Sequence, residues 1–410
     1  MTTTIINKNK KSNVPNLRFP EFQGEWEKQK LCDISSIVGR IGFRGYTTND
    51  IVEKGMGAIA LSPTNIVNNQ LTYDKDNTYI SMSKYEESPE IMIKRGDVIF
   101  VKTGSTVGKV AYVDKMICKT TLNPQVVVLK NIKCDNYILS VIMSTRNFQN
   151  KIQRITVGGA VPTLSQVAMG NIFISLPAAK EQEKISKFIS LLDERIATQN
   201  KIIEDLKKLK SAIIENHYNQ TEKQTASIAD LGEPFSVGNL AKDDLTETGM
   251  PCVVYGELFT TYGETISQIE SHTNKTTGMI LSKKGDLLFP SSTTVDAMSL
   301  IAPSVINVDG VILGGDMFGI HINHNYNAQY LSYYFNHIAK RQLAKFAKGS
   351  TIIHLHYADI EKAKLLLPSL EEQNRMAKCI MSLDAKINIE NFFISLLNSQ
   401  KTHLLRQMFI

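Results

Sequence analysis

Residues 176–196 read LPAAKEQEKISKFISLLDERI, and residues 367–387 read LPSLEEQNRMAKCIMSLDAKI. The two stretches share a Leu-Pro start, a glutamine and a Leu-Asp pair at a constant offset of 191 residues. The likeness continues without a gap to Tyr218 in the first copy and Phe409 in the second. Chance is a poor explanation for such a long match, so the sequence indicates a chain that is built twice.

Both copies are predicted to be helical. Neither residues 180–218 nor residues 371–409 contain Gly or Pro, and both stretches are rich in Lys, Glu, Leu and Ile. Each follows a proline, Pro177 or Pro368, and proline favours a helix start. At 1.5 Å per residue, each copy would form a helix on the order of 60 Å long.

Apolar residues recur with 4-3 spacing along each predicted helix. Seven of nine seam positions are apolar in each copy, and the two polar exceptions match: Gln199 and Lys210, then Glu390 and Lys401. A 3.5-residue period sustained over several heptads is typical of a coiled coil. The residues expected in the helix-pair interface are Ile185, Ile189, Leu192, Ile196, Gln199, Ile203, Leu206, Ile380, Leu383, Ile387, Glu390, Ile394 and Leu397.

We expect the two helices to pair antiparallel, because the long segment between them can bring the chain back. Each helix has one apolar stripe that needs a cover. In this arrangement Gln199 meets Glu390 at the middle, and such a polar pair can fix the register. Two unrelated surface helices are the plainer interpretation, but polar exceptions that match at one offset argue against it.

The segments before the two helices match less closely. GDVIFVKTGSTVGKVAYV (96–113) resembles GDLLFPSSTTVDAMSLIAP (285–303), and ITVGGAVPTLS (155–165) stands opposite AKGSTIIHLHYADI (347–360). Short apolar strands alternate with turn signals, which predicts two sheet-rich α+β domains. The contrast between similar helices and divergent domains predicts one scaffold that carries two different recognition surfaces.

Composition limits the class of protein. The chain has 410 residues, enough for two or three domains, and its 42% apolar content is ordinary for a globular protein. We expect no membrane span and no secretory signal, so the five cysteines, which form no CxxC pair, are expected to be reduced thiols in the cytoplasm. The net charge of +6 is compatible with DNA binding but is weak evidence for it.

Three stretches of the sequence match catalytic or metal-binding motifs only in part. KTGSTVGKV (102–110) resembles a phosphate-binding loop, but it has three residues instead of four between its outer glycines, and Val replaces the magnesium-binding Ser or Thr. Asn123-Pro124-Gln125 lacks the second proline and the aromatic ring of an adenine methyltransferase site, so it predicts a turn. His354 and His356 would share one face of a strand, without further metal ligands nearby in the sequence. We expect no catalytic residue, cofactor or metal.

The order of these parts is similar to that of the specificity subunit of Type I restriction–modification enzymes, over essentially the whole chain. The likeness lies in NLRFPEFQGEWEKQKLCDI (16–34) and in the Leu-Pro…Glu-Gln…Leu-Asp skeleton of the two quoted stretches. The resemblance implies an α+β fold of two sheet-rich target-recognition domains, separated by two long antiparallel coiled-coil helices, with internal pseudo-two-fold duplication.

On this resemblance the chain divides into five segments. These are an N-terminal tail (1–21), a first target-recognition domain (22–178), a central conserved long helix (179–222), a second target-recognition domain (223–368) and a distal conserved long helix (369–410). The implied partners are double-stranded DNA with a bipartite site, two methyltransferase subunits and, indirectly, nuclease/translocase subunits that use ATP. Methyl transfer, DNA cleavage and ATP hydrolysis are expected in these partners and not in this chain. No membrane partner is expected.

Two alternatives stay open. One is the recognition subunit of a Type II-like methyltransferase–nuclease system, and the other is a coiled-coil adaptor that does not bind DNA. Genome neighbourhood would separate them, because a Type I subunit should sit beside a methyltransferase gene.

Base edges are read by Arg, Lys, Asn and Gln, and phosphates are bound by small hydroxyls and amides. Contacts cannot be transferred between the domains, because Pro290 and Ser291 stand where the first domain has Val101 and Lys102. The DNA-binding candidates of the first domain are Arg40, Arg44, Tyr46, Lys102, Thr103, Ser105 and Lys109. Those of the second are Tyr255, Ser291, Ser292, Thr293, Thr294, Lys345, Lys348, His354 and His356.

Overall fold

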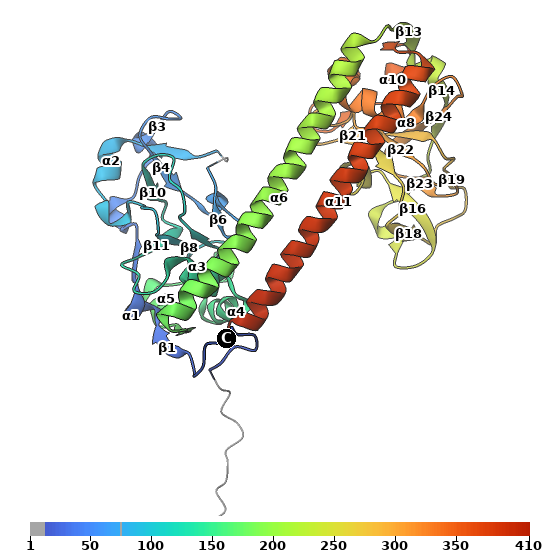
Figure 1. Cartoon of the computed structure of the whole chain (residues 1–410). Helices are drawn as coiled ribbons and strands as arrows, with labels where there is room; N and C mark the ends of the chain where they lie inside the picture. The colour runs from blue at the N-terminus through green and yellow to red at the C-terminus, as the bar shows by residue number, and fades with distance from the viewer. Residues whose placement is uncertain (1–12, 74–75) are drawn as a thin grey trace, which may run out of the picture. The chain divides into compact units, whose positions relative to one another are not determined.

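Two long helices, α6 (Ala179–Gln220) and α11 (Leu370–Met408), follow the two sheet-rich parts of the chain (Figure 1). The computed structural model describes residues 13–73 and 76–410. Contacts divide it into a first unit, Met1–Thr198 with Ile394–Ile410, and a second unit, Gln199–Phe393. Each unit therefore contains one sheet-rich domain and part of both long helices.

The first unit is built on a sheet with the strand order β2-β11-β8-β9-β6-β5, and a smaller sheet has the order β10-β4-β7-β3. Strand β1 (Glu27–Lys30) pairs antiparallel with β12 (Phe173–Leu176) just before α6. The other strands are β2 (Ser36–Gly39), β3 (Ile51–Val52), β4 (Ala58–Leu61), β5 (Ile66–Val67), β6 (Gln70–Leu71), β7 (Thr78–Ile80), β8 (Val98–Val101), β9 (Val110–Tyr112), β10 (Thr120–Leu122) and β11 (Val126–Lys130). The helices are α1 (Leu31–Ile34), α2 (Met82–Glu86), α3 (Asn136–Ser144), α4 (Arg146–Ile155) and α5 (Gln166–Gly170).

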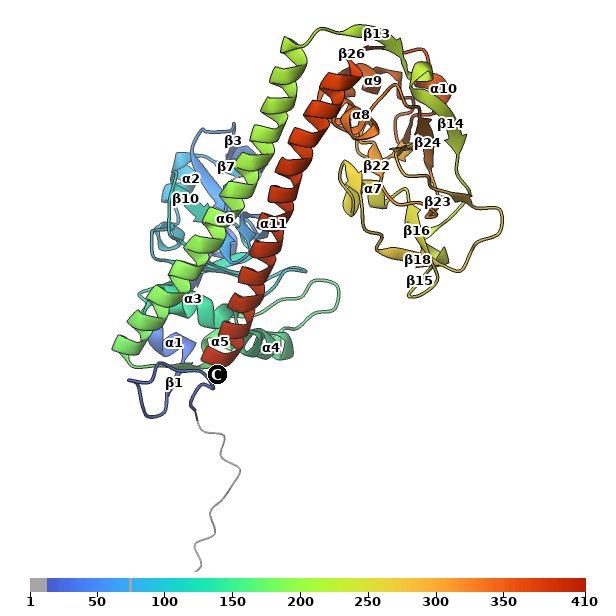
Figure 2. The ribbon, with the colours of Figure 1, turned by 45° about the vertical axis from the view of Figure 1, so that its right-hand side comes forward.

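The second unit repeats this plan with the orders β14-β24-β20-β22-β17 and β15-β18-β16-β23-β19. Figure 2 labels β14, β24 and β22 of the first sheet and β15, β18, β16 and β23 of the second. Strand β13 (Gln224–Ser227) pairs with β26 (Lys364–Leu367), as β1 pairs with β12. The other strands are β14 (Gly232–Ser236), β15 (Leu245–Thr246), β16 (Met250–Val254), β17 (Thr265–Ile266), β18 (Ser271–Thr273), β19 (Ile280–Leu281), β20 (Asp286–Pro290), β21 (Ser292–Thr293), β22 (Ser304–Ile306), β23 (Ile312–Gly314), β24 (Met317–Ile322) and β25 (Ile353–His354). The helices are α7 (Glu257–Thr260), α8 (Ala328–Tyr334), continued by a π-helical turn (Phe335–Ala339), α9 (Lys340–Leu343) and α10 (Tyr357–Ile360).

The register of the central strands also repeats. Val98 of β8 lies opposite Tyr112 of β9, and Leu287 of β20 lies opposite Val305 of β22. Both pairs follow the Gly-Asp turns that the sequence comparison aligned. The predicted α+β class and the internal duplication are confirmed.

Strand β8 is apolar along its whole length because both of its faces are covered. In β8, Phe100 packs in a core with Ile185 and Ile189 of α6, whereas Ile99 and Val101 pack in a second core on the other face. Burial at every position removes the alternation that a half-exposed strand would show.

The long helices pair antiparallel within each unit. In the second unit Gln199 donates to Glu390, Lys210 contacts Asp384, and further along α6 His217 contacts Glu372. In the first unit Lys401 contacts Asp193. Each of the thirteen residues expected in the interface is buried or half-buried. The pair Gln199–Glu390 is the one that the antiparallel register predicts.

A repeated glutamine explains part of the motif at each helix start. Buried Gln182 accepts from the Asp135 N–H at 2.8 Å and donates to the Pro177 carbonyl at 2.8 Å. Buried Gln373 does the same with Asn327 and Pro368, at 2.9 Å each. Asp135 and Asn327 are the N-caps of α3 and α8. The glutamine therefore ties the start of each long helix to the N-cap of a helix in its own domain, α3 or α8.

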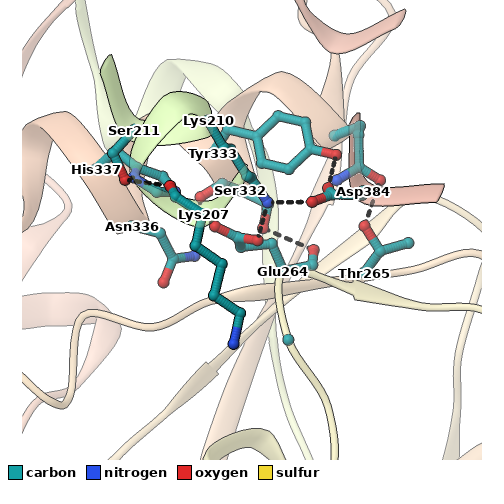
Figure 3. A network of polar contacts seen from close by, with 12 residues as sticks. Lys207, Lys210, Ser211, Glu264, Thr265, Ser332, Tyr333, Asn336, His337 and Asp384 are labelled. Carbon is teal, nitrogen blue, oxygen red and sulfur yellow. Dashed lines mark hydrogen bonds and ion pairs between the residues drawn. The ribbon is translucent and has the colours of Figure 1, made fainter. Parts of the chain in front are cut away.

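The Leu-Asp pair of the motif supplies a second tie. The Tyr137 hydroxyl donates to Asp193 at 2.7 Å, and the Tyr333 hydroxyl donates to Asp384 at 2.7 Å. Each aspartate also meets the lysine that interrupts the seam of the other long helix, Lys401 or Lys210 respectively. Figure 3 shows the network in the second unit. Each lysine therefore joins the two long helices by an ion pair, whereas an apolar residue at the same seam position would contribute only packing.

Candidate nucleic-acid interface

A loop and a hairpin meet beside the central sheet of the first unit. The loop is the Ser/Thr-rich stretch after β8, and its first residues, Lys102 and Thr103, donate backbone N–H groups to the Gln125 carbonyl at 2.9 and 3.3 Å. The Leu164 N–H donates to the Lys102 carbonyl at 2.8 Å, which binds the hairpin to the loop. We call residues 102–109, 125 and 157–165 the first loop patch.

The second unit contains the matching arrangement. The Ser291 N–H donates to the Asp316 carbonyl at 2.7 Å, and the Leu355 N–H donates to the Ser291 carbonyl at 2.9 Å. Ser292 of β21 lies opposite His354 of β25. We call residues 291–294, 316 and 348–356 the second loop patch. The two patches have the same backbone connections and different side chains.

Both hairpins turn through a glycine. Gly158 has φ +98° and Gly349 has φ +111°, a backbone region that other residues rarely adopt. A Cβ atom at Gly158 would lie 2.7 Å from the Val161 oxygen, and one at Gly349 would lie 2.1 Å from the Ile352 oxygen. These glycines keep the turn in both units, so the neighbouring positions are free to differ.

Four residues predicted in the first domain lie in the first loop patch. Ser105 and Lys109 are exposed, Lys102 and Thr103 are half-buried, and the Lys109 ammonium donates to the Ile66 carbonyl at 3.3 Å. Their contact with DNA stays a prediction.

The other three form a separate cluster that the structure does not join to the loop. Arg40 is 7% exposed, and its guanidinium donates to the Leu122 carbonyl at 2.9 Å and to Thr121 Oγ1 at 3.1 Å. It lies over the half-buried Tyr46 ring, 5.4 Å from the ring centre, and burial lowers the pKa of Arg40. Arg44 donates to the Glu87 carbonyl at 3.2 Å. Arg40 has its donors engaged inside the domain, so we leave it out of the candidate surface.

The predicted residues of the second domain gather in the second loop patch, with Tyr255 and Lys345 outside it. Ser291 and Ser292 are buried, and Ser292 Oγ donates to Asp316 Oδ2 at 2.6 Å. Thr293 is half-buried and Thr294 is exposed. The serines therefore shape the loop from inside, and Thr294 stands at its surface.

The hairpin side of the second loop patch carries its basic and imidazole groups. The His354 and His356 rings stack at 6.1 Å with an interplanar angle of 16°, so both lie on one face as the strand pattern predicts. The Lys348 ammonium contacts Asp359 Oδ1 at 2.5 Å while its side chain stays 76% exposed. Lys345 and Tyr255 are also exposed.

Within residues 13–73 and 76–410, no cluster of three or more His, Cys, Asp or Glu side chains is placed to bind a metal ion. The same part of the chain contains no helix that is both long and apolar enough to cross a membrane.

Sequence reasoning missed two exposed residues of the patches, Gln125 and Asp316. The triplet Asn123-Pro124-Gln125 was interpreted only as a turn before a strand, and the structure has a turn there before β11. The signal was nevertheless present, because Gln125 and Asp316 are separated by the same 191 residues as the helix motifs.

Residues 23–208 and 221–397 match the family described as the Type I restriction modification DNA specificity domain. The chain belongs to this family. Each match includes one sheet-rich domain and most of the long helix that follows it, in agreement with the duplicated fold.

Several known proteins are similar to this chain over most of its length. The Type I restriction enzyme MjaVIII specificity subunit of Methanocaldococcus jannaschii is 24% identical over 327 residues, 73% of this chain and 75% of that protein. The crystal structure of a Type-I restriction-modification system S subunit from M. genitalium has a TM-score of 0.56 at 15% identity, covering 97% of this chain and 99% of that chain. A chain from a structural study of complex assembly in the type I R-M system has a TM-score of 0.54 at 16% identity, covering 93% and 96%. These structural likenesses show the fold.

Proposed function

We propose that this chain is the DNA sequence-specificity subunit of a Type I restriction–modification complex. It reads a bipartite DNA target and forms the scaffold for two methyltransferase subunits, which join it to nuclease/translocase subunits. The chain supplies recognition, and its partners in the cytoplasm supply methyl transfer and ATP-driven cleavage.

One observation supports this proposal most directly. The two loop patches have equivalent backbone connections, yet Lys102 and Gln125 in the first correspond to Ser291 and Asp316 in the second. A frame that is kept while its surface side chains change is expected of a protein that reads two different sequences. Base edges in the major groove present distinct donors and acceptors, so different side chains select different bases.

The paired helices suggest how the two half-sites are spaced. Each helix is tied to a domain by a glutamine and an aspartate, so we expect helix length to set the distance between the half-sites. Two readers on one rigid support reach base edges about one helical turn apart. The target should therefore contain two short specific sequences and an unspecified spacer.

The test is to express the chain with its methyltransferase subunit and to map the methylated motif in host DNA by single-molecule sequencing. We expect adenine methylation at a two-part motif that depends on this chain, and no methyl transfer by the chain alone. Adding one heptad to both long helices should lengthen the spacer and leave both half-sites unchanged. Methylation of one continuous motif, or the same motif without this chain, would contradict the proposal.

A further inference from the structure

The two patches place one exposed side chain each at an equivalent point next to the loop. Gln125 follows β10 and directly precedes β11, and Asp316 follows β23 and directly precedes β24. In both units the backbone carbonyl of this residue accepts from the first loop residue, Lys102 or Ser291. The backbone at both positions is therefore anchored in the same way, and only the side chains differ.

Hydrogen bonds to Asn123 hold the backbone and the side-chain amide of Gln125 in place. Its N–H donates to Asn123 Oδ1 at 2.9 Å, and its Oε1 accepts from Asn123 Nδ2 at 3.2 Å. A Cβ atom at Gly104 would lie 3.4 Å from Gln125 Nε2, an ordinary contact distance, so the amide lies directly beside the loop. The Oε1 atom can accept a second hydrogen bond, and Nε2 has two protons to donate. The Gln125 amide can therefore donate one hydrogen bond and accept another at the same time.

Asp316 presents a carboxylate that is only partly satisfied. Its Oδ2 accepts from Ser292 Oγ at 2.6 Å, and the part of the chain that the structure describes places no Lys, Arg or His within ion-pair distance of it. The residue is exposed. Its partner Ser292 lies opposite His354 in the strand pair of β21 and β25, and the His354 ring stacks on the His356 ring. An unneutralised carboxylate is repelled by DNA phosphates, so at a DNA interface it needs a donor from the nucleic acid.

Base chemistry supplies partners that differ for the two side chains. Glutamine can bond adenine through N6 and N7 at once, whereas a carboxylate can accept from the N4 amino group of cytosine. Guanine and thymine offer acceptors at the corresponding major-groove positions, and they would oppose a carboxylate.

We propose that Gln125 and Asp316 are equivalent base-reading residues, Gln125 for an adenine in the first half-site and Asp316 for a cytosine in the second. This inference rests on the proposed DNA-recognition function and adds the residue and the base class at each site. The difference between the half-sites then follows in part from one amide and one carboxylate on a shared frame.

The experiment uses the full chain in complex with its methyltransferase subunit. Asp316→Asn keeps the shape and the acceptor for Ser292 Oγ, but it removes the charge and replaces one acceptor by a donor. We expect it to lose discrimination at one C·G pair of the second half-site by about 5- to 150-fold, measured by competition binding with single base-pair substitutions. Gln125→Glu should change one A·T position of the first half-site only.

Asp309→Asn is the matched control. Asp309 is an exposed aspartate that precedes β23, whereas Asp316 follows it, and Asn can still accept from the Lys284 N–H that Asp309 Oδ1 binds at 2.7 Å. The control should keep both half-sites. Co-purification with the methyltransferase subunit and thermal melting establish that each variant is folded and assembled.

The outcomes separate this inference from the proposed function. If the natural complex has no sequence-dependent binding or methylation, the proposed function fails. If it has a bipartite motif that both variants leave unchanged, the base-reading role is refuted while the function stands. A variant that weakens binding equally for all sequences, or a second half-site without a C·G pair, also refutes that role.

Discussion

The two junctions between the long helices and the domains use the same motif residues in different surroundings. In the second unit, Lys210 contacts both Asp384 and Glu264 at 2.5 Å, and Glu264 accepts from His337 Nε2 at 2.6 Å (Figure 3). In the first unit, Lys401 contacts Asp193. The Lys210 side chain is 8% exposed and the Lys401 side chain 22%, so the second junction is the drier one.

The first junction is more open because two residues of the second have smaller or uncharged counterparts. Strand register places Asn69, before β6, where the second unit has Glu264, before β17. Counted from the N-caps of α3 and α8, Val141 stands where the second unit has Tyr333. A cavity of about 600 Å³ remains there. Its lining includes Asn69, Tyr137, Val141, Asp193 and Lys401.

The comparison shows that duplication kept the ion pair and changed what encloses it. Counted from the helix N-caps, Tyr137 of α3 lies one helical turn earlier than Tyr333 of α8. Its hydroxyl nevertheless donates to Asp193, the aspartate that corresponds to Asp384. Burial and the bond to the aspartate raise the pKa of both tyrosine hydroxyls, which remain donors. The energetic weight of the same motif should therefore differ between the units.

Removing the second junction altogether should have the largest effect. A fragment of residues 1–222 leaves the seam of α6 uncovered, and a second copy is the nearest available cover. In an antiparallel self-pair, Lys210 of one copy takes the place of Lys401 beside Asp193 of the other, and Gln199 meets Gln199. We expect a symmetric dimer that methylates an interrupted palindrome of the first half-site. Light scattering and motif mapping test this, and a monomer or an asymmetric motif would show that the halves are not equivalent.

The next effect is the loss of each lysine. Lys210→Met leaves Glu264 and Asp384 without their shared cation in a buried site, and we expect a cost of about 3–5 kcal/mol. Lys401→Met leaves Asp193 beside a cavity that can admit water, and we expect about 1–2 kcal/mol. Thermal melting gives the loss, and hydrogen exchange in α8 and α3 shows which unit carries it. Equal losses would contradict the difference between the junctions.

Acidification should act on the second junction through Glu264. Burial alone would raise the pKa of Glu264, but hydrogen bonds from His337 and Lys210 and the Lys210 charge outweigh it and lower the pKa from 4.5 to about 2. This depressed pKa stabilises the folded state above pH 4.5, and the contribution disappears as pH falls toward 2. It amounts to at most about 3 kcal/mol. Glu264→Gln should be less stable at neutral pH and should show a flatter loss below pH 4.5; an unchanged pH profile would remove Glu264 from the network.

The smallest effect should come from adding charge to the first junction. Asn69 has φ +61°, so Asn69→Asp is chosen over glutamate because aspartate tolerates this backbone better. Placed in the cavity with Lys401, the new carboxylate should add about 0.3–1 kcal/mol at low salt and less at high salt. The gain should vanish in the Lys401→Met background. A gain that persists there would mean that the two groups do not interact.

Most features of the long helices that the heptad spacing of apolar residues predicts are present in the structure. The start of α6, the buried seam and the Gln199–Glu390 pair follow from local spacing, because each turn of a helix repeats the same burial. The interpretation of Lys210 and Lys401 only as polar exceptions was incomplete, since their partners lie on the opposite helix.

The loop patches were only partly predictable. Lys102, Ser105 and the residues around Ser292 stood out by chemical type, and the structure places them in the two patches. Arg40 has the same chemical attraction to DNA, but it is buried beside Tyr46 because Leu122 and Thr121 of β10 offer it acceptors that the local sequence does not reveal.

The sequence by itself determined the duplication, the two long helices, their antiparallel register and the α+β character of the domains. These depend on short-range periodicity and on one constant offset, both of which are visible along the chain. Only the tertiary structure decided that Gln125 lies beside Lys102, that Asp316 lies beside Ser292, and that Lys210 is enclosed where Lys401 borders a cavity. Such contacts join residues far apart in the chain, and their geometry is set by strand order and packing rather than by local spacing.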